Sequence, residues 1–250
     1  MSYYCDIVLL YYKSGGEHMK RITDRNLLEG YIREFGLDSL FKKDMRPFMS
    51  LMAYERGECI CNTGDELEYF YFNVKGKLKV YTLMENGKSL LLRFNKPLSI
   101  LGDVEFMSGY KIKCNVDSLN ESHLIGIKVE DIRKHAGDDP VFLSYVIRNL
   151  GYKLYTISNS TSINLLYSLE KRFASYIISI SSEDSNSKGI NEIKTTSMTE
   201  MATLLGTSYR HLNRVIRELA DKGVVIKRNG NISVLDYGAL KELSGGLLYE

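Results

Sequence analysis

The amino-acid sequence predicts an α+β fold in three parts: an antiparallel β barrel or sandwich, a long helix, and a helix-turn-helix that ends in a small hairpin. Three observations predict this fold. Short runs of β-branched and aromatic residues, separated by glycines, fill residues 50–128. Apolar residues recur at spacings of four and three after Pro140. A capped helix, a glycine turn and a basic amphipathic helix follow from Ser197.

Length and composition indicate a two-domain protein of the cytoplasm with no membrane span. The 250 residues suffice for two cores, and the four cysteines are too few and too scattered for a disulfide framework. No apolar run approaches the ~20 residues that a membrane helix requires, and no basic segment marks a signal peptide. Met19 is an alternative start, so residues 1–19 are set apart as an N-terminal extension.

The β part is expected to follow a helical segment. Residues 20–47 are expected to be helical because apolar residues share one side and Pro47 follows. Strands are expected at FYFNV, KLKVYTL, SLLLRF, KCNVDSL and HLIGIK, with a hairpin turn at Glu85-Asn86-Gly87-Lys88. Regularly spaced short strands are typical of a compact antiparallel barrel or sandwich.

A long helix is predicted over residues 139–164, and its apolar stripe has coiled-coil spacing. The stripe consists of Leu143, Ile147, Leu150, Leu154, Ile157 and Thr161. It is either a seam between two copies of the chain or the buried face of an ordinary helix, and its length favours the seam. A second helix, Leu165–Ile180, is expected to pack Leu166, Leu169, Phe173, Tyr176 and Ile177 in the C-terminal domain. The stretch SSEDSNSKG is expected to be a surface loop.

Residues 197–223 predict two helices joined by a tight turn. Ser197 and Glu200 can form a capping box for the first helix, and small Ala202 lets the second helix approach closely. Gly206 tolerates the left-handed backbone that the turn requires. Ser208 can cap the second helix. That helix is expected to bury Leu212, Val215, Ile216 and Leu219, and to end at Gly223.

The other face of the second helix is basic, and a hairpin follows it. VVIKR and ISVLD flank Asn229-Gly230-Asn231, a hairpin signal. Residues 197–235 contain six Lys or Arg and three acidic residues, a net charge of +3. The positive charge that DNA binding requires is therefore concentrated in this segment. This order predicts a winged helix-turn-helix that inserts one helix into the major groove. The candidate DNA-contacting residues are Ser208, Tyr209, Arg210, His211, Asn213, Arg214, Arg217, Lys227 and Arg228. The alternative is a packing pair of helices with a solvated basic face.

The order of these parts resembles the Crp/Fnr family of bacterial transcription regulators. The resemblance covers residues 45–236 and rests on this helix-turn-helix and on YERGECICNTGDELEYFYFNVKGKLKVYTLMENGKSLLLRF. Within the family, the run LGTSYRHL is most similar to the YeiL-type branch. The resemblance implies four regions: the extension (1–19), a β-roll effector domain of the cyclic-nucleotide-binding jelly-roll kind (20–138), a dimerisation helix (139–164), and a winged helix-turn-helix domain (165–250).

The resemblance also implies partners and residue roles. The expected partners are double-stranded DNA with a palindromic operator, a second copy of the chain, a small-molecule effector and, as a further candidate, RNA polymerase. Arg214 matches the family's usual arginine, which would read guanine, whereas Arg210 stands where the family typically has glutamate. A guanidinium donates where a carboxylate accepts, so we expect a half-site different from the family's usual one.

For the effector, the resemblance points to Gly102 and Asp103 at the ribose position and Lys113 at the phosphate position. Aspartate replaces the family's glutamate and lysine replaces its bidentate arginine, and both changes argue against cAMP. The effector is therefore unassigned.

Redox chemistry is the next alternative. Cys5, Cys59, Cys61 and Cys114 could hold an iron–sulfur cluster or act as a thiol switch, but free cysteines are usually buried as small hydrophobes. The four histidines are dispersed and show no metal-ligand spacing, so no metal site is expected.

Two further hypotheses belong to other classes of protein. An enzyme is disfavoured because no nucleophile elbow, phosphate-binding glycine loop or metal-ligand pair is present, and no catalytic residue is assigned. A ligand-regulated module that acts only on a protein partner stays open. Steeply salt-dependent DNA affinity would exclude it.

Overall fold

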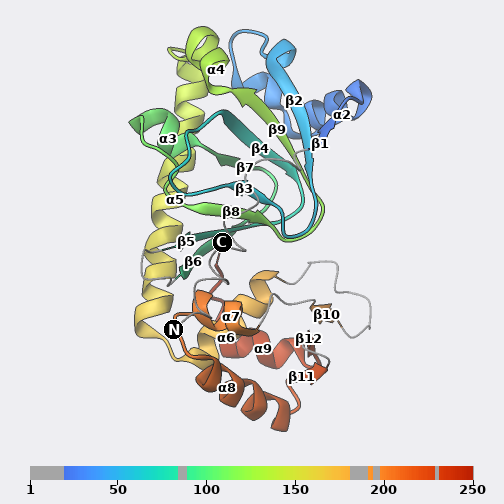
Figure 1. The fold of residues 1–250 in the computed structure, drawn as a ribbon, viewed down its shortest axis with the longest axis vertical. Helices are drawn as coiled ribbons and strands as arrows, with labels where there is room; N and C mark the ends of the chain where they lie inside the picture. The colour runs from blue at the N-terminus through green and yellow to red at the C-terminus, as the bar shows by residue number, and fades with distance from the viewer. Residues whose placement is uncertain (1–19, 84–88, 181–190, 194–197, 229–230, 250) are drawn as a thin grey trace, which may run out of the picture.

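The structure, a computed structural model, describes residues 20–83, 89–180, 191–193, 198–228 and 231–249. A β domain lies at one end, a helical domain at the other, and one long helix runs beside the first and down to the second (Figure 1). Among the described helices, none is long and apolar enough to cross a membrane.

The β domain consists of two antiparallel sheets, which confirms the expected strands. The five-stranded sheet has the order β1 (Lys20–Ile22), β2 (Met49–Tyr54), β9 (Ser122–Lys128), β4 (Tyr69–Lys75), β7 (Ser99–Leu101). The four-stranded sheet has the order β3 (Cys59–Cys61), β8 (Asn115–Ser118), β5 (Leu78–Leu83), β6 (Ser89–Asn95). The predicted turn at 85–88 lies outside the described residues, but Leu83 and Ser89 on either side of it are paired.

The expected helix over residues 20–47 is only partly correct. Residues 20–22 form β1, which pairs with β2, and α2 spans Arg25–Phe35. Asp24 starts α2 by accepting hydrogen bonds from two backbone amides, and Gly36 ends it with a φ of 61°. Two short 3₁₀ turns, Leu37–Leu40 and Arg46–Phe48, complete the segment. The apolar spacing correctly predicted a helix in this segment. The capping residues Asp24 and Gly36 limit that helix to the middle of the segment.

Two shorter helices flank the sheets, and one long helix covers their side. The short ones are α3 (Asp103–Ser108) and α4 (Val129–Ala136). The long helix α5 spans Pro140–Leu166 and is capped by Asp139, which accepts from Val141 N and Lys42 N. Phe142 of α5 packs against Phe70 of β4 with ring centroids 5.5 Å apart. Buried aromatic contacts therefore fix α5 to the five-stranded sheet.

The helix that follows α5 begins later than expected. Helix α6 spans Leu169–Ile180, because Tyr167 is extended and the Ser168 hydroxyl accepts from Lys171 N. Leu165 and Leu166 thus end α5, and Leu166 is 78% exposed rather than packed. The other four predicted packing residues are buried.

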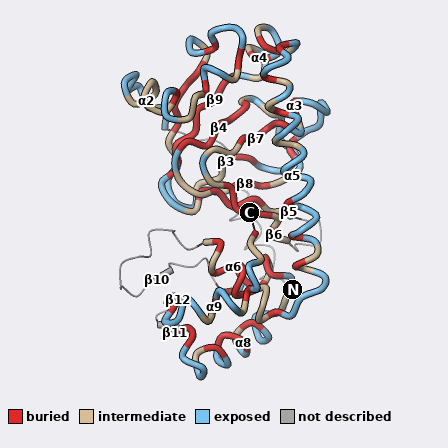
Figure 2. Tube along the Cα trace, turned by 180° about the vertical axis from the view of Figure 1, so that it is seen from behind, coloured by how far each residue is buried: buried red, intermediate tan, exposed pale blue. Residues whose placement is uncertain are grey.

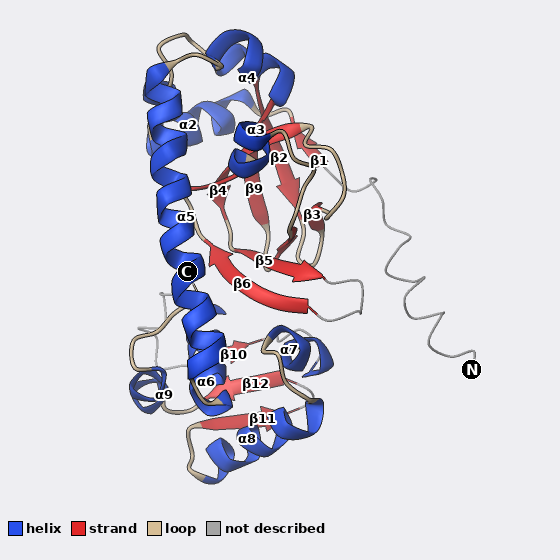
Figure 3. Cartoon of the chain, turned by 90° about the vertical axis from the view of Figure 1, so that its left-hand side faces the viewer, coloured by secondary structure: helices blue, strands red, loops and turns tan. Residues whose placement is uncertain are grey.

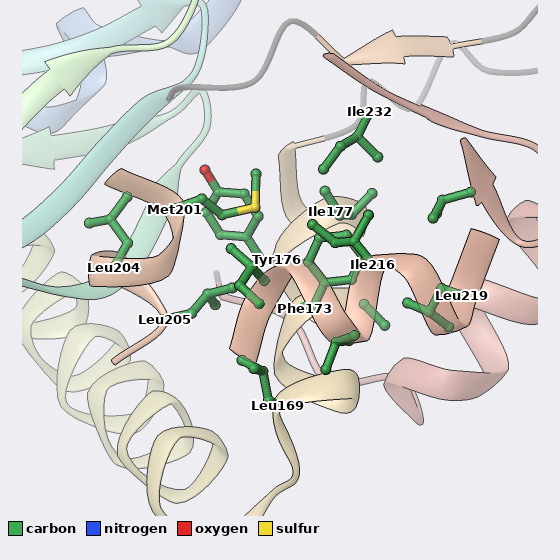
Figure 4. Close-up of a cluster of buried hydrophobic side chains, with 14 of the residues drawn as sticks. Leu169, Phe173, Tyr176, Ile177, Met201, Leu204, Leu205, Ile216, Leu219 and Ile232 are labelled. Carbon is green, nitrogen blue, oxygen red and sulfur yellow. The ribbon is translucent and has the colours of Figure 1, made fainter. Parts of the chain in front are cut away.

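The C-terminal domain contains the predicted helix-turn-helix and two elements that the sequence did not predict. Its elements after α6 are β10 (Asn191–Ile193), α7 (Met198–Leu204), α8 (Tyr209–Asp221), β11 (Val225–Arg228), β12 (Asn231–Val234) and α9 (Tyr237–Ser244). Strand β10 adds a third strand beside β12, and α9 packs on α6. Phe173, Ile177, Ile216 and Leu219 share one buried cluster that joins α6 to α8 (Figure 4). The predicted loop at 181–190 lies outside the described residues.

The C-terminal domain packs against β5 and β6 of the β domain (Figure 3). The Phe94 amide donates to the Tyr249 carbonyl at 2.6 Å, and the Phe94 ring meets Tyr176 edge-on at 5.6 Å. The Lys77 ammonium donates to the Ser179 carbonyl at 2.6 Å. The orientation of the helix-turn-helix is therefore fixed by the β domain as well as by the α5–α6 connection.

A buried ion pair links the two domains. Lys79 of β5 is 3% exposed, and its ammonium lies 3.1 Å from Asp117 Oδ2 and 2.6 Å from Glu200 Oε1 on α7. Both carboxylates raise the pKa of Lys79, although burial opposes them. One lysine of the β domain thus holds the first turn of the helix-turn-helix.

We expect Glu200→Gln to weaken this link. Loss of one charged partner should lower the free energy of unfolding by about 1 kcal/mol, because Asp117 still pairs with Lys79 and Glu200 is partly solvated. Urea titration measures the change, with Glu242→Gln on the exposed face of α9 as control. Equal stability of the two variants would show that the ion pair does not hold the domains together.

Candidate DNA interface and effector region

The turn between α7 and α8 has the predicted geometry. Gly206 has a φ of 62°, and the Thr207 amide donates back to the Ala202 carbonyl at 2.9 Å. Ala202 is 2% exposed at the contact between the helices, and the Ser208 hydroxyl accepts from His211 N at 3.2 Å. Gly223 ends α8 with a φ of 72°. Ser197 lies outside the described residues, so its capping box with Glu200 stays a prediction.

Helix α8 buries its predicted apolar face and exposes its basic face. Leu212, Val215, Ile216 and Leu219 are each at most 5% exposed. The predicted contact residues that lie exposed are Ser208, Tyr209, Arg210, His211, Arg214 and Arg217, together with Lys227 on the strand that follows α8. Arg214 Nε lies 3.8 Å from Glu218 Oε1, an exposed pair that contributes little and leaves the guanidinium free for another acceptor.

The wing connects to α8 through Lys227. Its ammonium donates to the Asn213 Oδ1 at 2.9 Å, and Asn213 is half-buried. An ammonium can only donate, so this bond occupies the oxygen of Asn213 and leaves its amide nitrogen as the donor. Arg228 ends β11, but its side chain and Asn229-Gly230 lie outside the described part of the chain.

A groove of about 380 Å³ lies between α8 and the wing. Tyr209, Asn213, Arg217 and Lys227 line it together with Ile216 and Ala220. Four of the predicted contact residues therefore line one groove, and hydrogen-bond donors dominate its polar side chains. Such a surface is complementary to phosphates and to the guanine edge.

The candidate effector residues lie in different environments. Gly102 has a φ of 92°, and a Cβ there would lie 2.8 Å from Leu67 Cδ1, so glycine is required. Asp103 is 1% exposed inside the β domain. Lys113 is exposed, and its ammonium lies over the Tyr110 ring at 5.7 Å. The structure therefore places the Lys113 side chain at the surface and the Asp103 carboxylate in the interior, while the Lys113 amide donates to Glu105 Oε1 of α3 at 3.4 Å.

The partner of Asp103 is Lys153 of α5, which sequence reasoning missed. The two form an ion pair, and the Lys153 ammonium also donates to the Ile100 carbonyl at 2.9 Å. Burial lowers the pKa of Lys153, although Asp103 opposes this effect. The sequence contains one indication of this partnership: Lys153 is the single charged residue between Arg148 and Glu170. A lone lysine in such a helix indicates a specific partner.

The cysteines do not form a reactive or metal-binding group within the described residues. Cys61 is buried, Cys59 and Cys114 are half-buried, and none is disulfide-bonded. Burial raises the pKa of Cys59 to about 12, and it also raises the pKa values of Cys61 and Cys114. Thiolate is the reactive form, so these thiols are poor nucleophiles near pH 7. Cys5 and His18 lie outside the described residues, and no metal-binding cluster occurs in the rest.

Comparison with known proteins agrees with this geometry. A cyclic nucleotide-binding domain model matches residues 51–138, and a Crp-like helix-turn-helix model matches residues 171–243. The regulatory protein YeiL of Escherichia coli O157:H7 is 23% identical over 212 residues, which are 85% of this chain and 92% of that protein. The chain belongs to the Crp/Fnr family of transcription regulators.

Solved structures of Crp/Fnr regulators share the fold. The CRP-family regulator TTHB099 of Thermus thermophilus has a TM-score of 0.64 and 22% identity, covering 79% of this chain and 98% of that one. A crp/fnr-family protein of Eubacterium rectale has a TM-score of 0.68 and 20% identity, covering 80% of this chain and 92% of that one. The two family models, rather than these structures, show that the chain is a Crp/Fnr-type DNA-binding transcription regulator with an effector-type β-roll, and this family consists of regulators, not enzymes.

Proposed function

We propose that this regulator acts as a homodimer whose two α8 helices enter successive major grooves of a palindromic operator. Arg214 reads guanine, and Arg210 donates to guanine or phosphate, so the half-site differs from the family's usual one. Lys227 and Arg228 contact the phosphate backbone from the wing, and Ser208, Tyr209, His211, Asn213 and Arg217 complete the surface. The exposed basic face of α8 is the observation that carries this proposal.

Support for the dimer comes from the surface of α5. The predicted seam residues Ile147, Leu154 and Ile157 are 60%, 72% and 39% exposed, whereas Phe142 and Val146 on another face are fully buried. Of the other predicted seam residues, Thr161 is exposed, Leu143 is half-buried, and Leu150 is half-buried against the core of the β domain. The outer side of α5 is exposed along much of its length (Figure 2). A row of exposed apolar residues with a/d spacing fits a second copy of the same helix.

We expect Leu154→Asp to dissociate the dimer. Two unpaired carboxylates would face each other across the seam, and their desolvation should raise the dimer dissociation constant by roughly 100-fold or more. Sedimentation equilibrium measures it, with Asn159→Asp as the matched control because Asn159 is exposed on α5 outside the seam positions. Equal association of the two variants would rule out this seam.

The effector domain is proposed to shift the geometry of α5 and so the spacing of the two α8 helices. The domain limits of this proposal are the N-terminal extension (1–19), the effector domain (20–138), the dimerisation helix (139–164) and the DNA-binding domain (165–250). Similarity to YeiL supports the predicted branch, and the raised thiol pKa values disfavour a thiol switch. Action in the cytoplasm and contact with RNA polymerase remain predictions from the family resemblance.

DNA affinity measured against salt concentration tests the proposal. Each neutralised phosphate should contribute a slope of about −0.9 to the plot of log affinity against log salt. The variant Lys227→Ala should make this slope less steep by about 0.9, because one phosphate contact is lost. It should weaken binding to every DNA sequence by the same factor. A DNA affinity that does not fall steeply as salt rises would instead favour the alternative, a module that acts only on a protein partner.

A further inference from the structure

A short segment after α9 brings the chain back between the two domains. Gly245 and Gly246 have φ values of 62° and 75°, a left-handed backbone that glycine adopts without strain. The Gly246 amide donates to the Ser244 hydroxyl at 3.2 Å, and the chain then runs to a contact with β6 (Figure 1). We call residues 245–249 the return segment. Its residue Tyr249 is fully buried.

Tyr249 of the return segment contacts three elements at once. Its carbonyl accepts from the Phe94 amide of β6 at 2.6 Å, and its amide donates to the Ser179 hydroxyl of α6 at 2.9 Å. Its hydroxyl donates to Asn164 Oδ1 near the end of α5 at 2.9 Å. Its ring lies in the same buried cluster as Phe94 and Ile163. One residue therefore connects the β domain, the C-terminal domain and the long helix between them.

The bond to Phe94 occupies an open position on the β domain. Among the described strands, β6 is the edge of the four-stranded sheet, so its outward backbone groups must find partners outside the sheet. Phe94 is 2% exposed, and the Tyr249 carbonyl supplies the acceptor for its amide. A buried amide that loses its acceptor costs free energy. Because the acceptor belongs to the other domain, this bond holds only while the two domains keep one relative orientation.

In this orientation, helix α8 lies on the side of the C-terminal domain that is far from the β domain (Figures 1 and 3). Two half-sites stand at a fixed distance on DNA, so two α8 helices can bind together only if each keeps a defined orientation. We propose that Tyr249 is a positioning residue for DNA recognition: by binding β6, α6 and α5, it fixes the orientation that presents the basic face of α8 to the operator. This inference rests on the proposed function, because it requires a dimer that reads two half-sites.

Operator affinity of the full chain tests this role. Tyr249→Ala should weaken binding to the inverted pair of half-sites by about tenfold, because a loosely held domain loses more freedom of movement when it binds. Binding to a duplex with one half-site should change by less than about twofold, since a single α8 has no fixed distance to meet. The preference for the operator over a version lengthened by about two base pairs between the half-sites should fall at least about threefold. Fluorescence anisotropy measures these affinities.

Two variants separate positioning from stability. Tyr249→Phe keeps the ring and both backbone bonds and loses the bond to Asn164, so it should retain most of the spacing preference. Tyr54→Ala removes an equally large buried side chain from β2, and it should lower stability without changing the spacing preference. An unchanged spacing preference in Tyr249→Ala, or an equal loss of preference in Tyr54→Ala, would overturn the proposal.

A second measurement uses the unaltered protein and does not depend on whether Tyr249→Ala folds. Hydrogen exchange of the Phe94 amide, followed by NMR without DNA, should be at least about 100-fold slower than that of an unprotected amide. Exchange at the unprotected rate would show that the Tyr249 carbonyl does not hold β6, and it would overturn the proposal. If the unaltered protein bound one half-site as tightly as the inverted pair, the proposed function would be contradicted and the positioning role with it, whereas slow exchange would still support the contact between the domains.

Discussion

Replacement of Arg214 by alanine should weaken operator binding by on the order of 1–3 kcal/mol per half-site and relax the preference at one base position. Arg214 lies exposed on α8, and the ion pair that it forms with Glu218 at 3.8 Å is a weak competitor for the guanidinium. The variant would lose the proposed bidentate arginine–guanine contact, and alanine offers no substitute donor.

Electrophoretic mobility shift with the selected operator and with each single-base change measures both effects. Lys241→Ala removes one exposed positive charge from α9 of the same domain and serves as the control for net charge. The control should change affinity little and preference not at all. If Arg214→Ala retained full affinity and full preference, Arg214 would not be the guanine-reading residue.

Replacement of Asp103 by asparagine should lower the free energy of unfolding by about 3 kcal/mol at pH 7, because it leaves the Lys153 ammonium buried without its partner. Burial already lowers the pKa of Lys153, and loss of Asp103 lowers it further below the unfolded value of about 10.4. Between those two pKa values the unfolded chain binds more protons than the folded chain, so stability rises with pH. The deficit of the variant should therefore shrink between pH 7 and pH 9.

Urea titration at both pH values measures this deficit relative to the unaltered protein. Asp138→Asn, at an exposed position, is the matched control and should show almost no deficit at either pH. A deficit for Asp103→Asn that is the same at pH 7 and pH 9 would show that Lys153 does not carry the effect.

Local chemistry explains which parts of the fold the sequence could predict. The start and the buried face of helix α8 were predicted correctly because its cap, Ser208, and its apolar spacing are both local signals. The turn at Gly206 could be predicted because it depends on a local property, the left-handed backbone conformation that glycine tolerates. The errors lie at boundaries: Ser168 separates α5 from α6, and Asp24 and Gly36 limit α2.

Long-range partners explain what could not be predicted. Lys153 acquires its role only because the fold brings Asp103, fifty positions away, to α5. The local pattern around Glu200 predicts only a capping box, and it could not show that the Glu200 carboxylate also reaches Lys79 in the other domain.

Selection of bound sequences from random DNA, with and without reducing agent, tests the central claim most directly. An exposed α8 in each subunit of a dimer predicts enrichment of two inverted half-sites with centres about 10–10.5 base pairs apart, unaffected by the reducing agent. Enrichment of a single half-site without symmetry, or no enrichment, would contradict DNA reading by a pair of α8 helices.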